Sequence, residues 1–338
     1  MASDFKTHYY GGIRKYQWVT IPLELHGVIA LKDGSTVTVA IGAGDEPKLV
    51  ISDLLPHLGA EQSKKTLAEG IEGEQLNILV GSEPIEGEEK DRVKLAAMKR
   101  LYEKYGIVEE DFVSAELEAV PAANATDIGL DASMIGAYGH DDRVCGYAAL
   151  KALLDLDEVP GKTAVCVLAD KEEIGSVGVS GMQTAAFDTF MEDLCDSQNV
   201  PVRVCLEKSF CLSADVTAAF DPNFASVYEK RNSSFLNYGM GLCKYTGSRG
   251  KSGASDASAE VVAYARRIFD ENGVIWHMAE LGKVDAGGGG TVACYMANRN
   301  INTLDAGVPV LAMHAPFEVV AKLDCYMTYK GMSTVYKN

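Results

Sequence analysis

The feature that most constrains the fold is a change of pattern near residue 126, after which helical segments alternate with short apolar runs. The strand-like runs occupy residues 163–169, 202–206, 273–278 and 308–313. The helical segments occupy residues 143–154, 180–195, 254–270 and 288–297. Such alternation is typical of helices layered on a largely parallel sheet. The sequence therefore predicts an α/β domain over residues 126–338.

The sequence before residue 126 has a different character. Residues 18–31 and 35–44 are rich in β-branched side chains and are separated by a turn at residues 32–34. Residues 91–105 place apolar side chains at helical spacing, and residues 111–120 alternate again. We predict a β-rich domain over residues 1–125 that contains one helix.

Composition narrows the possible functions. The 338-residue chain carries a net charge of −17, which disfavours binding to a nucleic-acid backbone. No run of about 18 apolar residues is present and the N-terminus shows no signal peptide, so we expect neither a membrane span nor secretion. The eight cysteines are scattered and form no Cys-x-x-Cys pair, which favours core thiols in a reducing cytoplasm.

Acidic residues follow two of the strand-like runs. Glu172 and Glu173 come directly after residues 163–169, and Asp215 lies beyond residues 202–206. Adjacent glutamates on a tight loop can point to different targets, such as a metal and a water. Taken alone, the pair could equally be a solvated acidic turn, and Asp215 could be a turn residue or a helix cap.

Two further candidates lie at element ends. His314 directly follows residues 308–313, and Asp141 precedes the expected helix 143–154. A structural histidine and a helix N-cap are the ordinary interpretations of these positions. Peptide hydrolysis near neutral pH needs an activated water, a general base and positive charge for the oxyanion, which two metals and a carboxylate supply. Carboxylates and imidazoles at strand ends suit that chemistry.

Several long motifs, in order, resemble the aspartyl aminopeptidase family of zinc metallopeptidases, in its bacterial form. They are YYGGIRKYQW, DFVSAELEAVPA, AYGHDDRVCGYAAL, ADKEEIGSVGVSGMQ, SADVTAAFDPN and VPVLAMHAPFE. The resemblance covers essentially the whole chain. It implies a cytoplasmic, metal-dependent aminopeptidase that removes N-terminal, acidic residues from peptides, and a homo-oligomer assembled through the β-rich domain. A related deacylase is a minor alternative.

The resemblance also implies roles for individual residues. Asp141 would bridge two Zn²⁺ ions, Glu173 and His314 would complete one metal site, and Asp215 would hold the other metal. Glu172 would be the general base that takes a proton from the attacking water. Co²⁺ or Mn²⁺ could replace zinc.

The resemblance offers weaker candidates for the substrate pocket. Lys244 and the glycines 287–290 match pocket residues of the family, although an ordinary solvated lysine and a flexible surface loop remain open. His57 could reach the pocket of a neighbouring subunit. His277 ends an expected strand and is interpreted as a core residue.

The family pattern breaks at one place. The family carries a further histidine ligand in a motif resembling His-x-Asp-Ser-Pro upstream of the YYGG segment, and this sequence contains no such motif. We therefore expect a family member without its N-terminal portion, a weakened second metal site, and an uncovered sheet edge with exposed apolar surface. The alternative is a catalytically impaired or dead member that retains assembly only.

Overall fold

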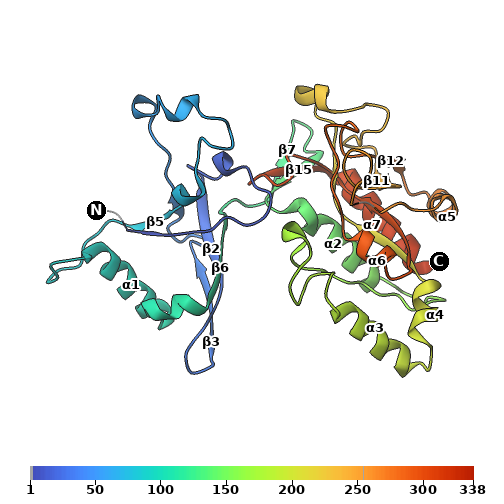
Figure 1. Ribbon diagram of the computed structural model, residues 1–338, viewed down its shortest axis with the longest axis horizontal. Helices are drawn as coiled ribbons and strands as arrows, with labels where there is room; N and C mark the ends of the chain where they lie inside the picture. Colours follow the sequence, from blue (N-terminus) through green and yellow to red (C-terminus); the bar gives the residue numbers. More distant parts are fainter. Residues whose placement is uncertain (1–2, 254) are drawn as a thin grey trace. The chain divides into compact units, whose positions relative to one another are not determined.

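The structure, a computed structural model, describes residues 3–253 and 255–338. The chain divides into two compact units, Met1–Asn124 and Ala125–Asn338 (Figure 1). Within the described residues, no helix is both long enough and apolar enough to cross a lipid bilayer.

The N-terminal unit is built on an antiparallel sheet in which the long strand β2 is the central element. Along β2, β3 and β4 pair on one side and β6 on the other. The strands are β1 (Ser3–Phe5), β2 (Pro22–Ala30), β3 (Thr36–Ile41), β4 (Leu49–Ile51), β5 (Ile78–Gly81) and β6 (Ala115–Pro121). The 3₁₀ turns are η1 (Lys15–Gln17), η2 (Pro56–Leu58), η3 (Gln62–Lys64), η4 (Gly73–Gln75) and η5 (Glu109–Ser114).

One α-helix accompanies this sheet. Helix α1 (Arg92–Tyr105) begins within a residue of the expected start and ends at Gly106, whose φ of 73° suits a glycine C-cap. Leu101 and Tyr105 pack against the buried cluster of Ile29, Val39 and Ile107. The predicted helical face is therefore the face that covers the sheet.

The C-terminal unit combines helices with two sheets, as the α/β prediction requires. Its strands are β7 (Thr126–Ile128), β8 (Met134–Ala137), β9 (Phe210–Ala214), β10 (Thr217–Ala218), β11 (Met240–Cys243), β12 (Trp276–Met278), β13 (Asn302–Gly307), β14 (Pro309–Leu311) and β15 (Glu318–Ala321). Its helices are α2 (His140–Leu154), α3 (Ala186–Ser197), α4 (Val202–Glu207), α5 (Ala259–Glu271), α6 (Ala293–Ala297) and α7 (Lys322–Lys337), with 3₁₀ turns η6 (Glu172–Ile174) and η7 (Pro222–Val227).

The two sheets differ in strand direction. The four-stranded sheet runs β12-β11-β13-β9, with β11/β12 and β13/β9 parallel and β11/β13 antiparallel. The five-stranded sheet runs β10-β14-β15-β8-β7, in which only β10/β14 is parallel. The expected α/β layering is present, but the sheet expected to be largely parallel is instead divided into two mixed sheets.

Helices cover these sheets through apolar faces. Helix α5 places Val261, Ala265 and Phe269 against Met240 and Leu304 of the four-stranded sheet. Helix α7 runs beside α2 (Figure 1). Cys145 of α2 packs with valines of the five-stranded sheet. This packing fixes the strand ends at which the candidate site lies.

Two of the segments that were expected to be strands do not form strands in the structure. Residues 202–206 form helix α4, because Val202, Cys205 and Leu206 lie at helical spacing and pack together against the core next to α3 and α6. Residues 163–169 pair with no strand among the described residues, and Val167 and Leu168 are 44% and 61% exposed. Two large apolar side chains of this segment are therefore exposed.

The remaining elements are confirmed with shifted ends. The expected helix 254–270 begins at Ala259, where the Ser258 hydroxyl accepts a hydrogen bond from the backbone N–H of Val261. Its first expected residue, 254, lies outside the described residues. The expected helix 288–297 shortens to α6, because residues 287–290 form an irregular glycine loop.

Candidate metal centre

Four separate segments bring the predicted site residues into one cavity of about 410 Å³. Asp141 lies at the irregular start of α2, Asp215 follows β9, and His314 follows β14. Glu172 and Glu173 begin the 3₁₀ turn η6. All five line the cavity, so side chains far apart in the sequence converge there, and Asp215 and His314 do so from positions that follow strands.

The first ligand group contains one imidazole and two carboxylates. His314 Nε2 lies 3.0 Å from Asp141 Oδ2 and 3.3 Å from Glu173 Oε1. One ligand atom from each residue lies within 4.8 Å of the others. Two carboxylates and an imidazole are a ligand set that suits zinc.

A second group shares Asp141 and adds two aspartates. Asp141, Asp142 and Asp215 each offer an oxygen, and these oxygens lie within 4.8 Å of one another. The peptide bond between Asp141 and Asp142 is cis. Asp142 was not among the predicted ligands, although its place beside Asp141 in the sequence was a signal for it.

The site concentrates acidic groups, of which Asp141, Asp142, Glu172 and Asp215 are partly buried. Burial, with added repulsion from neighbouring carboxylates, raises the pKa of Asp142 to about 8 and raises the pKa of Asp215 well above its usual value. Burial likewise raises the pKa of Glu173 to about 7 and shifts the pKa of Glu172 upward. Carboxylates crowded in this way favour a bound cation.

A second observation, on a buried oxygen of Asp142, also indicates that these residues suit a metal ion. Oδ1 of Asp142 is buried, and among the described residues it has no hydrogen-bond partner. A buried carboxylate oxygen left without a partner is costly in free energy. A cation held by Asp141, Asp142 and Asp215 would satisfy that oxygen.

Glu318 supports both ligand segments and was missed by sequence reasoning. This side chain is 1% exposed. Its Oε2 accepts the backbone N–H of Asp141 at 3.0 Å, and its Oε1 accepts the backbone N–H of His314 at 2.7 Å. The signal in the sequence was an acid at the start of an apolar strand, where a charge needs partners.

Close backbone approaches shape the cavity wall. A Cβ atom at Gly307 would lie 1.7 Å from the carbonyl oxygen of Asp215, so only glycine fits between β13 and the residue after β9. A Cβ at Gly288, whose φ is 107°, would lie 2.3 Å from the carbonyl oxygen of Gly247. The predicted glycine run 287–290 does line the cavity.

Asp305 is a second acid that the sequence analysis missed. It is buried on β13, lines the cavity, and accepts a hydrogen bond from the Thr291 hydroxyl at 2.7 Å. Burial raises the pKa of Asp305 to about 6. The contact joins β13 to the end of the glycine loop.

Two predicted substrate residues lie elsewhere. Lys244 does not line the cavity, and its Nζ lies 2.6 Å from Asp256 Oδ1. His57 is an exposed residue of η2 in the N-terminal unit. His277, interpreted as a core residue, is half-buried, and its Nδ1 lies 3.2 Å from the carbonyl oxygen of Tyr238.

A carboxylate–imidazole cluster at the strand ends of an α/β unit is a kind of site found in metallohydrolases. Residues 3–336 match the family described as "Aminopeptidase I zinc metalloprotease (M18)". The chain belongs to the M18 family. This membership makes it an enzyme of the zinc-dependent aminopeptidase class.

Individual relatives and solved structures support membership of the M18 family. The chain is 52% identical over 339 residues to a "Probable M18 family aminopeptidase 1" of Clostridium acetobutylicum, covering 98% of this chain and 73% of the relative. The crystal structure of an M18 aminopeptidase from Thermotoga maritima matches with a TM-score of 0.96 at 44% identity. That match covers 100% of this chain and 76% of the solved one. The aminopeptidase I structure from Clostridium acetobutylicum gives a TM-score of 0.94 at 49% identity, covering 100% and 74%.

Proposed function

We propose that the chain removes N-terminal residues from peptides at a two-metal site in which Asp141 is shared. Glu173 and His314 complete one ligand group, and Asp215 belongs to the other, with Asp142 beside it. The observation that carries this assignment is that the two groups of closely spaced ligand atoms have Asp141 in common. Co²⁺ and Mn²⁺ are proposed substitutes for Zn²⁺, since carboxylates and imidazoles also bind these ions.

Each residue then has a defined task. Zinc in such a site supplies positive charge that polarises the scissile carbonyl and acidifies water. Glu172 lines the cavity and stands outside both ligand groups, so its carboxylate is available to take a proton from the attacking water and pass it to the leaving amine. Burial, with added repulsion from Asp141, raises the pKa of Glu172 above its usual value.

Replacing Glu172 tests the proposed mechanism. We expect Glu172→Gln to lower kcat by about 100- to 10,000-fold, because the amide cannot accept the proton. Zinc content, measured by elemental analysis, should stay near wild type since Glu172 is not a ligand. Glu192→Gln, an exposed glutamate of α3, is the matched control. An unchanged rate in Glu172→Gln would falsify the assignment.

The number of metals can be counted directly. We expect two Zn²⁺ per chain at saturation, and Asp215→Asn should reduce this to one while Glu173 and His314 keep theirs. Native mass spectrometry measures both values. A wild-type chain that saturates with a single ion would contradict the shared-ligand assignment.

We also propose a preference for acidic N-terminal residues. Arg249, Lys251 and Lys283 line the cavity on segments that also carry the acid Glu280. This excess of positive charge would attract a substrate carboxylate. Lys244 remains a further candidate, although its amine is engaged by Asp256.

Self-association through the N-terminal unit is a further part of the proposal. Leu54, Leu55 and Leu58, which flank His57 in the sequence, are 46–69% exposed, and grouped exposed leucines mark contact surfaces. His57 would contact the pocket of a neighbouring copy. We expect wild-type protein to be oligomeric in light scattering and Leu58→Glu to lower its mass. An equal mass for both proteins would contradict this surface.

A reducing compartment, the cytoplasm, fits the thiols. All eight cysteines are free, and three of them, Cys211, Cys243 and Cys294, adjoin the carboxylate Asp305, whose charge raises their pKa further after burial. Free, protonated thiols in a core are stable where thioredoxin and glutathione keep them reduced.

A further inference from the structure

The glycine loop, residues 287–290, is fixed at its end by a buried acid of the four-stranded sheet. Asp305 lies on β13, which pairs with β11 on one side and with β9 on the other. Asp305 is 5% exposed, and its Oδ1 accepts a hydrogen bond from the Thr291 hydroxyl at 2.7 Å. Because a strand that is paired on both sides is a rigid reference, Thr291, the residue directly after the glycines, is held in a constant place.

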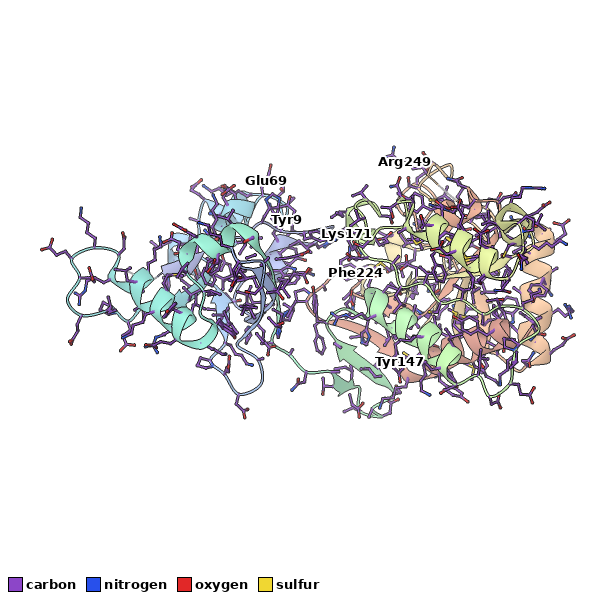
Figure 2. All side chains as sticks on the ribbon, turned by 90° about the horizontal axis from the view of Figure 1, so that it is seen from below. Tyr9, Glu69, Tyr147, Lys171, Phe224 and Arg249 are labelled. Carbon is purple, nitrogen blue, oxygen red and sulfur yellow. The ribbon has the colours of Figure 1, made fainter. Side chains whose placement is uncertain are left out.

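The middle of the glycine loop has a second contact, with a more mobile segment. The backbone N–H of Gly247 donates to the carbonyl oxygen of Gly289 at 2.6 Å. Gly247 belongs to a loop that reaches the outside of the C-terminal unit at the exposed residue Arg249 (Figure 2). A contact with an exposed loop is less rigid than a contact with a central strand. The orientation of the glycines therefore depends mainly on Asp305.

These contacts leave one backbone donor directed at the cavity. In a trans peptide the C=O group and the following N–H group point in opposite directions. Since the carbonyl oxygen of Gly289 faces Gly247, the N–H of Gly290 faces the other way. Within the described part of the chain this N–H makes no hydrogen bond, and Gly290 lines the cavity. It is therefore available to an oxygen atom of a bound ligand.

The end of the glycine loop lies beside the proposed general base. Gln183 Nε2 donates both to the carbonyl oxygen of Gly175, which follows the turn η6, and to the hydroxyl of Tyr295 on α6. Burial raises the pKa of Tyr295, and interactions with Cys294 and Glu172 add to this shift. A base that protonates the leaving amine stands next to the substrate residue after the scissile bond. The glycine loop therefore borders the space that receives that residue.

We propose that Asp305 is a positioning residue that holds, through Thr291, the N–H of Gly290 where it donates to the carbonyl oxygen of the substrate residue directly after the scissile bond. The proposal rests on the aminopeptidase function proposed above and adds the group that binds the leaving part of the peptide. It predicts that the Thr291 hydroxyl matters for a substrate that carries this carbonyl group and does not matter for one that lacks it.

The test compares two amides that differ in this carbonyl group. Glutamyl-alaninamide carries it, and glutamyl isopropylamide has a methyl group in place of the carboxamide. With zinc-loaded wild type we expect KM to be about tenfold lower for the alaninamide, the effect of one hydrogen bond, at a similar kcat. Thr291→Val should abolish this KM ratio and keep kcat on the isopropylamide within about twofold. Thr291→Ser retains the hydroxyl and should retain the ratio.

Two further variants separate positioning from general damage. Thr334→Val removes a buried hydroxyl whose hydrogen bond to the Lys330 carbonyl oxygen lies on α7, outside the cavity, and it should keep the KM ratio. Asp305→Asn weakens the contact with Thr291 and should lower the ratio. The double variant Asp305→Asn/Thr291→Val should lose no more than Thr291→Val alone, because both changes act on one contact. Equal losses on both amides in Thr291→Val, or additive losses in the double variant, would overturn the proposal.

Binding separates this inference from the proposed function. Calorimetric titration of the Glu172→Gln protein with both amides measures the contact without turnover. We expect about tenfold tighter binding of the alaninamide, and loss of this difference when Thr291→Val is added. A wild type that cleaves neither amide would refute the proposed function, while this difference in binding would uphold the inference. Equal binding of both amides would refute the inference.

Discussion

Glu318 illustrates how one buried side chain can organise a proposed metal site without being one of its proposed ligands. Its two carboxylate oxygens accept the backbone N–H groups of Asp141 and His314, which lie on segments far apart in the chain. Burial raises the pKa of Glu318, and the two N–H donors oppose that shift. The side chain therefore fixes the spacing of two proposed ligands through their backbones.

Replacing Glu318 should weaken metal binding. In Glu318→Gln one backbone N–H faces an amide NH₂ and loses its acceptor, so we expect zinc affinity to fall about 10- to 100-fold. Competition with a chromophoric chelator measures this affinity. Glu271→Gln, an exposed residue at the end of α5, is the control. Equal affinity in both variants would show that the backbones hold their spacing without Glu318.

Residue patterns predicted the acids that follow apolar runs better than the acids within strands. The positions of Glu172, Glu173, Asp215 and His314 after apolar runs indicated a shared edge. The structure brings these residues together with Asp141, although residues 163–169 and 202–206 are not strands. Asp305 and Glu318 lie within strands, where sequence alone gives no partner to justify a buried charge. Their hydrogen-bond donors come from distant segments that become neighbours only in the fold.

At the scale of elements, the turn η6 depends on hydrogen bonds more than on packing. Its flanking residues Lys171 and Gly175 have φ values of 62° and 97°, and Ile174 is 41% exposed. Gln183 Nε2 donates to the Gly175 carbonyl oxygen at 2.6 Å and to the Tyr295 hydroxyl at 3.1 Å. Gln183 thus connects the turn that bears Glu172 to helix α6.

Removing this connection should reduce turnover without removing a ligand. We expect Gln183→Ala and Tyr295→Phe each to lower kcat about 10- to 100-fold, because misplacement of a base by about 1 Å has effects of that size. The double variant should lose little more than either single variant, since both act on one contact. Stopped-flow or steady-state kinetics measures this coupling, and Gln198→Ala after α3 is the control. Fully additive losses would contradict the shared role.

Hydrophobic periodicity predicted the type of element correctly where the periodic pattern extended over several turns. Helix α1 and helix α5 span several turns, and both were predicted as helices. The five apolar-rich residues 202–206 fit both an alternating strand and a helical face, and packing against α3 and α6 decided for the helix. Residues 163–169 are apolar but pair with no strand among the described residues. Apolar composition alone therefore does not predict strand pairing.

For the whole molecule, buried acids away from the metal centre link stability to pH. Asp324 begins the C-terminal helix α7, is fully buried, and accepts the backbone N–H groups of Asn237 and Gly239 at 2.8 and 2.7 Å. Burial raises the pKa of Asp324 to about 6. Because the folded pKa exceeds the unfolded value, the stabilising contribution is complete below about pH 4 and is lost as pH rises through 6.

This linkage has a measurable consequence. Between pH 4.5 and 7 the free energy of unfolding of wild type should fall by about 2 kcal/mol relative to Asp324→Asn, which cannot titrate. Urea unfolding at several pH values measures the difference. Asp193→Asn, an exposed aspartate of α3, should run parallel to wild type. A constant gap between wild type and Asp324→Asn would show that Asp324 keeps one charge state throughout.

The close contact at Gly307 restricts the substitutions that this enzyme can tolerate. The carbonyl oxygen of Asp215 occupies the space that any side chain at position 307 would need. Substitutions there would press directly on a proposed ligand segment, so a library of variants selected for activity should return glycine at this position. Engineering a larger substrate pocket must therefore begin elsewhere in the lining, at residues 281–284, where exposed side chains line the cavity and can be exchanged.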